Sequence, residues 1–118
     1  MEYRVSQTEP RRIEILSSDP PLDSESASMD WVALCWEHDV TRLLVHDAAL
    51  GDAFYQLKTK VAGAVIQKMV NYGIRMAVVI GDTPRGTAHF HEMQREANQG
   101  PHFRVFGDVE AASRWLDE

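Results

Sequence analysis

Hydrophobic residues in the middle of the chain change their spacing twice. Two short, nearly continuous apolar runs, Arg42–Asp47 and Ile74–Ile80, predict buried β-strands. Between them, Leu57–Tyr72 carries apolar residues at helical spacing, and Asn71-Tyr72-Gly73 predicts the end of that helix. A strand, a long helix and a second strand form a right-handed crossover, so we predict that the two strands run parallel in one sheet.

The N-terminal segment shows the other period, an alternation of apolar and polar positions. Tyr3 and Val5 alternate with polar residues, Gln7–Pro10 is a turn signal, and Ile13 and Ile15 resume the alternation. This pattern predicts an antiparallel β-hairpin with one buried face.

The rest of the chain predicts three more helices and one more strand. They are a helix over Ala27–His38, a helix presenting Phe90, Met93 and Ala97, a strand over His102–Phe106, and a final helix presenting Val109, Ala112 and Leu116. The element order is therefore β-β-α-β-α-β-α-β-α. We predict a single α/β domain over residues 1–118, with a mixed sheet of an antiparallel hairpin followed by parallel strands, and helices packed on it.

Composition and charge narrow the classes of function. A net charge of −6 over 118 residues argues against a partner that is nucleic acid or an anionic membrane. Cys35 is the only cysteine, so no intrachain disulfide can form, and a reducing cytoplasm is the expected location. The longest apolar stretch, Met76–Ile80, is far shorter than the ~20 residues of a membrane-spanning helix. The segment Gly81–Gly86 lacks the lysine of a phosphate-binding loop, and we expect no cofactor.

Several short stretches together carry a family resemblance. They are Phe54-Tyr55-Gln56-Leu57-Lys58-Thr59, Val61-Ala62-Gly63, Ile66-Gln67-Lys68, the run from Asn71 to Val79, Glu96-Ala97-Asn98-Gln99-Gly100 and Val105-Phe106. The chain from Trp31 to its C-terminus resembles a bacterial family catalogued as domain of unknown function 4180. That family has no established activity, so the resemblance implies no reaction.

The element order of that family is similar to that of STAS domains (sulfate transporter and anti-sigma-factor antagonist). In STAS domains a serine or threonine at the start of a helix can be phosphorylated. The resemblance places Thr59 near that position, with His46 and Asp47 at the end of the preceding strand. This chain departs from the STAS pattern because it has no Asp-Ser pair before the helix, and the likeness implies the fold more than the phosphorylation.

Lys58 and Lys60 flank Thr59 in the predicted first turn of the long helix. Helix N-termini favour acidic side chains, so two lysines there run against the usual preference. With the free backbone N–H groups they predict a site for a small anion such as phosphate or a carboxylate. The alternative is that Thr59 is an ordinary N-cap and the lysines extend into solvent.

Three polar residues follow the two predicted parallel strands, where open α/β sheets usually bind ligands. His46, Asp47 and Asp82 would share one rim if those strands are adjacent. Such a rim supports general acid–base chemistry. The alternative is that Asp47 and Asp82 only begin loops.

Two other pairs of residues bear on metal binding and on protein contact. His89 and His91 would point about 160° apart on a helix, so they predict no shared metal site. Trp31 and Trp36 lie about 140° apart on the first helix, so both are buried only if two elements cover it. Otherwise one tryptophan is exposed and indicates a protein contact.

The sequence thus favours a cytoplasmic, non-enzymatic and regulatory module. Its partner would be an unidentified protein at Trp31 or Trp36, or a small anion at Lys58, Thr59 and Lys60. A homodimer is consistent with the same surface. The competing hypothesis is a small enzyme that uses the rim of His46, Asp47 and Asp82.

Overall fold

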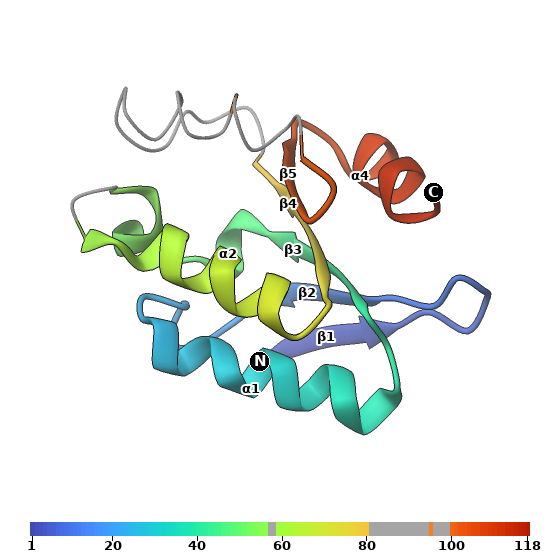
Figure 1. The fold of residues 1–118 in the computed structure, drawn as a ribbon, viewed down its shortest axis with the longest axis horizontal. Helices are drawn as coiled ribbons and strands as arrows, with labels where there is room; N and C mark the ends of the chain where they lie inside the picture. Colours follow the sequence, from blue (N-terminus) through green and yellow to red (C-terminus); the bar gives the residue numbers. More distant parts are fainter. Residues whose placement is uncertain (57–58, 81–94, 96–99) are drawn as a thin grey trace.

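The computed structural model describes residues 1–56, 59–80, 95 and 100–118, and Figure 1 shows their arrangement. Over these residues the elements, in chain order, are β1 (Glu2–Val5), β2 (Ile13–Ser17), α1 (Glu25–His38), β3 (Arg42–His46), the short 3-10 helices η1 (Asp47–Ala49) and η2 (Asp52–Tyr55), α2 (Val61–Asn71), β4 (Arg75–Val79), β5 (Phe103–Phe106) and α4 (Val109–Leu116).

The strands form a mixed sheet in the order β1-β2-β3-β4-β5. β1 and β2 are antiparallel, and every other neighbouring pair is parallel. The predicted opening hairpin and the predicted parallel crossover around α2 are both confirmed. The α/β class and the mixed sheet are therefore as the sequence indicated.

The larger core lies between the sheet and the two helices α1 and α2. Ile13 and Ile15 of β2, and Leu43 and Val45 of β3, point to this side, because alternate residues of a strand face opposite sides of the sheet. They pack in one cluster with buried side chains of α1 and α2, including Trp31. This cluster contains most of the buried apolar side chains of the described residues.

The other side of the sheet is covered by α4 (Figure 1). Leu44 and Ala77 face this side and pack against Trp115 and Leu116. The contacts of α4 are with β3, β4 and β5. The helix therefore covers one half of this side of the sheet, and the half formed by β1 and β2 carries charged side chains, such as Arg4 and Glu14.

A row of arginines across the sheet holds the C-terminal end of α4. Arg42 and Arg75 are paired in register on β3 and β4, and Arg12 precedes β2 on the same side. Nε of Arg42 donates to the carbonyl oxygen of Leu116 at 2.6 Å, and Arg12 binds the carboxylate of Asp117 at 3.1 Å. Positive charge is favourable where a helix ends in free carbonyl groups, so this row fixes α4 on the sheet.

Two helix starts differ from the sequence-based expectation. α1 begins at Glu25, two residues early, because Ser24 caps it by accepting a hydrogen bond from the Ala27 amide at 3.2 Å. α2 begins at Val61 rather than Leu57, because Lys60 adopts a left-handed conformation with φ 62°. The predicted helix around Phe90 lies outside the described residues.

Candidate functional site

Two exposed aromatic side chains meet on the outer surface of α1 and α2. Trp36, near the end of α1, is 61% exposed, and Tyr72, at the end of α2, is 40% exposed. Their ring centroids lie 5.2 Å apart with an interplanar angle of 75°, an edge-to-face contact. We call this pair the aromatic face.

The position of Trp36 follows from how α1 packs. Trp31 and Cys35 face the core and are 2% and 1% exposed, so the side of the helix that they occupy lies against the sheet and α2. Trp36 is about 140° around the helix from Trp31, and among the described residues its aromatic neighbour is Tyr72. Of the two outcomes that the sequence left open, the structure has one tryptophan buried and one exposed.

A shallow hollow adjoins the aromatic face between the two helices. It has a volume of about 340 Å³, and Tyr72 forms part of its wall. The carboxylate of Glu25 and the ammonium of Lys68 also line it and form an ion pair at 3.1 Å. Glu37 and Asp39, next to Trp36 in the chain, are exposed and form no ion pair with any described residue. The residues beside Trp36 in the chain are therefore acidic, and one cation lies near them, because the guanidinium of Arg11 donates to the carbonyl of His38 at 3.1 Å.

The structure places Thr59 and Lys60, two of the three predicted anion-binding residues, before α2 rather than in its first turn. The hydroxyl of Thr59 donates to the carbonyl oxygens of Ala53 and Gln56, at 2.5 and 2.7 Å. The same oxygen accepts from the Val61 amide at 3.3 Å. Lys60 is exposed and is the N-cap residue without a side-chain capping bond, and Lys58 lies outside the described residues. The small-anion site at these three residues stays a prediction.

In the rim predicted from His46, Asp47 and Asp82, the structure shows His46 in contact with a residue that the prediction did not include, Glu14. β3 and β4 are adjacent, as that prediction required, but Asp82 lies outside the described residues. Nε2 of His46 lies 2.6 Å from Oε2 of Glu14 on β2, and both side chains are about three quarters buried. A carboxylate on one ring nitrogen orients the imidazole and leaves the other nitrogen for a ligand or a proton.

The partnership of Glu14 and His46 was missed from the sequence, although a signal for it exists. Glu14 lies between two buried isoleucines, so it must face the side of the sheet opposite to them. His46 follows the buried Val45, so its side chain also faces the side of the sheet opposite to the larger core. The contact itself depends on the parallel pairing of β2 with β3, which the sequence did not specify. The acid–base hypothesis at His46 stays a prediction.

Cys35 has the environment of a structural thiol. It is 1% exposed in the core under α1, and burial raises its pKa from 9.0 to about 12. A thiol that stays protonated is a poor nucleophile, because the thiolate is the reactive form.

The described residues contain neither a candidate metal-binding group nor a candidate membrane-spanning helix. Within the described ranges, no three histidine, cysteine, aspartate or glutamate side chains are grouped so that they could hold a metal ion. None of the helices there is long and apolar enough to cross a membrane. The predicted pair of His89 and His91 lies outside the described residues.

Comparison with known proteins identifies a family. A family model described as a domain of unknown function, DUF4180, matches residues 7–116, which is nearly the whole chain. The chain belongs to this family, as the resemblance from Trp31 to the C-terminus indicated. Neither a curated protein nor a solved structure matches the chain, so the likeness to STAS domains stays a prediction.

Proposed function

We propose that this domain is a regulatory binding module whose aromatic face contacts a basic peptide segment with an apolar anchor residue. The observation that carries this proposal is the exposed pair of Trp36 and Tyr72, held edge to face at 5.2 Å. Tryptophan and tyrosine are among the residues that contribute most to the affinity of protein interfaces.

The folding of the domain does not account for this pair. A tryptophan that is 61% exposed leaves most of its apolar surface in water, while the other described tryptophans, Trp31 and Trp115, are almost fully buried. Its position is therefore unfavourable in the free protein, and covering it with an apolar side chain would remove that surface from water.

The charge around the aromatic face selects the partner. Glu37 and Asp39 carry carboxylates without an ion-pair partner among the described residues, and the chain has a net charge of −6. Lysine or arginine in a bound segment would pair with these groups and speed the encounter. The hollow beside Tyr72, lined by Gln67 and Asn71, offers polar contacts for a peptide backbone.

A displayed peptide library selected on the immobilised domain tests the proposal. We expect the enriched peptides to combine lysine or arginine with an aromatic or large aliphatic residue. Trp36→Ser should weaken their binding by about thirtyfold, the effect of losing one central aromatic contact. Val109→Ser is the matched control, because Val109 is 40% exposed on α4, away from this surface. Equal binding by both variants would contradict the proposal.

Sedimentation velocity tests whether a second copy of the chain, rather than a peptide segment of another protein, covers the aromatic face. A monomer at all concentrations, together with peptide enrichment, agrees with the proposal. A dimer that dissociates in Trp36→Ser but persists in Val109→Ser would overturn it, because the aromatic face would then be covered by another copy of the same chain.

A further inference from the structure

The strand β1 forms one edge of the sheet, and no strand of the described residues lies on its outer side (Figure 1). Glu2, Tyr3 and Arg4 are exposed along this edge. Tyr3 is 38% exposed and the preceding Met1 is 52% exposed, so this short segment carries two of the five large apolar side chains that are exposed among the described residues. The edge therefore offers apolar surface to a partner.

The backbone of β1 directs hydrogen-bonding groups to the same open side. The amide of Ser6 donates to the carbonyl of Arg12 at 2.8 Å, so these two residues form a hydrogen-bonded pair at the end of the hairpin. Because such pairs alternate along antiparallel strands, the amides and carbonyls of Tyr3 and Val5 point away from β2. Among the described residues their outward groups have one polar contact, from the Gln7 side chain to the Val5 carbonyl at 3.4 Å. An edge of this kind can pair with another strand.

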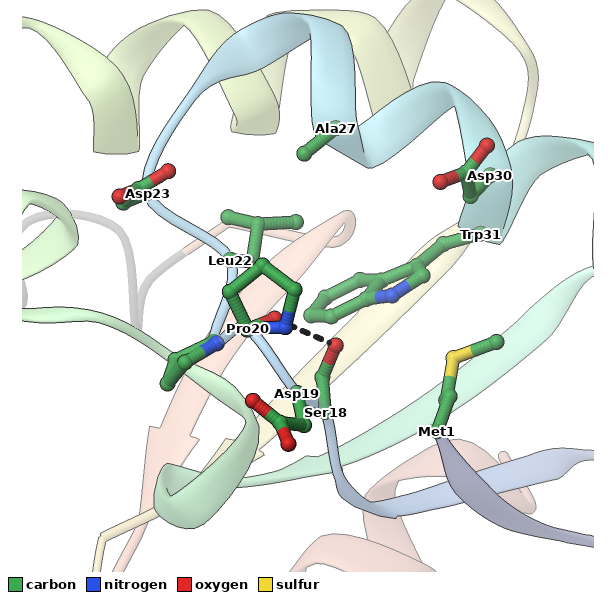
Figure 2. A pocket seen from close by; sticks show the side chains of 10 residues that line it. Met1, Ser18, Asp19, Pro20, Leu22, Asp23, Ala27, Asp30 and Trp31 are labelled. Carbon is green, nitrogen blue, oxygen red and sulfur yellow. Dashed lines mark hydrogen bonds between the residues drawn. The ribbon is translucent and has the colours of Figure 1, made fainter.

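Side chains of different chemistry lie on the two sides of β1. Val5 packs against the larger core, and Met1 lines a hollow beside Trp31 of α1 (Figure 2). The odd-numbered residues therefore lie on the α1 side of the sheet, and Glu2 and Arg4 lie on the opposite side. One side of the strand is thus apolar, and the other carries one charge of each sign.

We propose that two copies of this chain form a dimer by antiparallel pairing of β1 with β1, around a two-fold axis at Tyr3. In this register Tyr3 faces Tyr3 of the second copy, and Met1 faces Val5. These residues have outward-pointing backbone groups, so they form the hydrogen-bonded pairs. Glu2 faces Arg4 twice, at the pairs where side chains lie closest, and opposite charges there stabilise the pairing.

The charges select this register from those that the outward backbone groups allow. Moving the axis to Glu2 sets Glu2 against Glu2, and moving it to Arg4 sets Arg4 against Arg4. Like charges directly opposite each other destabilise a pair of strands. The axis at Tyr3 is the one that places each charge opposite its complement, so the strand is complementary to itself.

Both charged side chains are available to a second copy. Glu2 forms no ion pair with a described residue. The Arg4 side chain is 68% exposed and its guanidinium lies 3.8 Å from the carboxylate of Glu14. That carboxylate has a closer partner in His46, at 2.6 Å, so Arg4 can turn towards Glu2 of the second copy.

Sedimentation velocity of the protein over a range of concentrations tests the proposal. A strand of four residues gives a small interface, so we expect a reversible dimer whose fraction rises with concentration. Glu2→Arg and Arg4→Glu each set like charges opposite each other twice, and each should weaken self-association about tenfold. An equimolar mixture of the two variants should associate as the wild type does, because opposite charges face each other again.

Two substitutions on α4 are matched controls. Glu110→Arg and Arg114→Glu change the net charge by the same amounts, at side chains that are 83% and 73% exposed. Both should dimerise as the wild type does. Amide hydrogen exchange gives a second readout, because the amides of Tyr3 and Val5 should exchange more slowly at high concentration in the wild type and the controls, but not in Glu2→Arg.

Four results would overturn the proposal. They are a monomer at every concentration, assemblies larger than a dimer, equal association of Glu2→Arg and Glu110→Arg, and a mixture that associates no better than either variant alone. The substituted side chains are exposed, so the variants should fold.

This dimer is independent of the peptide contact proposed at the aromatic face. It leaves Trp36 uncovered, so it should persist in Trp36→Ser. A monomer would overturn the pairing of β1 and leave the peptide contact standing, whereas loss of peptide selection would not affect the dimer.

Discussion

Raising the pH should destabilise this domain through one buried thiol. Cys35 lies in the core beneath α1 and is 1% exposed. Burial disfavours the thiolate and raises the pKa of Cys35 from 9.0 to about 12. In the unfolded chain the thiol returns to water and loses its proton near pH 9.0. Between the two values the unfolded state therefore binds fewer protons than the folded state.

The sign and the size of the effect follow from this difference. A group whose pKa is raised by folding contributes its full stability below the unfolded pKa and loses it as the pH rises towards the folded pKa. The window is thus from about pH 9 to about pH 12. Between pH 7 and pH 10 the Cys35 thiol should lower the free energy of unfolding by about 1.4 kcal/mol.

Urea unfolding at pH 7 and pH 10 measures this loss when the wild type is compared with Cys35→Ala. The variant loses a buried sulfur atom and is less stable at both pH values. The two proteins differ in no other titratable group, so the loss of stability between the two pH values should be about 1.4 kcal/mol larger in the wild type. An equal loss in both proteins would show that Cys35 does not keep its proton through burial.

Five further substitutions have effects whose direction follows from the structure. Trp31→Ala should lower the free energy of unfolding by about 3–5 kcal/mol, because this side chain is almost fully buried. Trp36→Ala should lower it by only about 1–2 kcal/mol, because most of that ring is already in water. Urea unfolding midpoints measure both changes. Gly73→Ala should lower the free energy of unfolding by about 1 kcal/mol, because Gly73 has the left-handed φ of +69°. Gly63→Ala should raise it by about 0.5–1 kcal/mol, because Gly63 lies inside α2 with open space around it. Opposite signs in thermal melts would support the assigned geometry, and equal signs would contradict it. Arg42→Met removes the hydrogen bond to Leu116 and should cost about 1–3 kcal/mol, with faster hydrogen exchange in α4 as the specific readout.

The fold could be predicted where local pattern and neighbouring elements agree. The apolar run at Arg42–Asp47, the helical spacing that ends at Gly73 and the alternation at Ile13 and Ile15 each specify an element and its buried side. The start of α2 could not be predicted in this way. It depends on the hydroxyl of Thr59, which bonds carbonyl oxygens before the helix, and on the left-handed conformation of Lys60.

The candidate sites were harder to predict because they join residues distant in the chain. Glu14 and His46 meet only through the pairing of β2 with β3, and Trp36 meets Tyr72 only through the packing of α1 on α2. The sequence could state that both tryptophans are buried only if two elements cover α1, but not whether they do or which tryptophan is exposed. Which tryptophan is exposed depends on which side of α1 faces the sheet. The apolar pattern of α1 does not identify that side clearly, because the polar residue Ser28 is fully buried there.

The irregular pattern of α1 is itself an argument about function. Ser28 is buried because its hydroxyl donates to the carbonyl of Glu25 at 2.5 Å, so this polar residue fits the core at little cost. Trp36 has no comparable explanation, since a polar residue at that exposed position would serve folding as well. α4, by contrast, buries Trp115 and Leu116 and exposes its charged side. Because this unexplained exposed side chain lies on α1, the outer surface of this helix is where binding should be sought first.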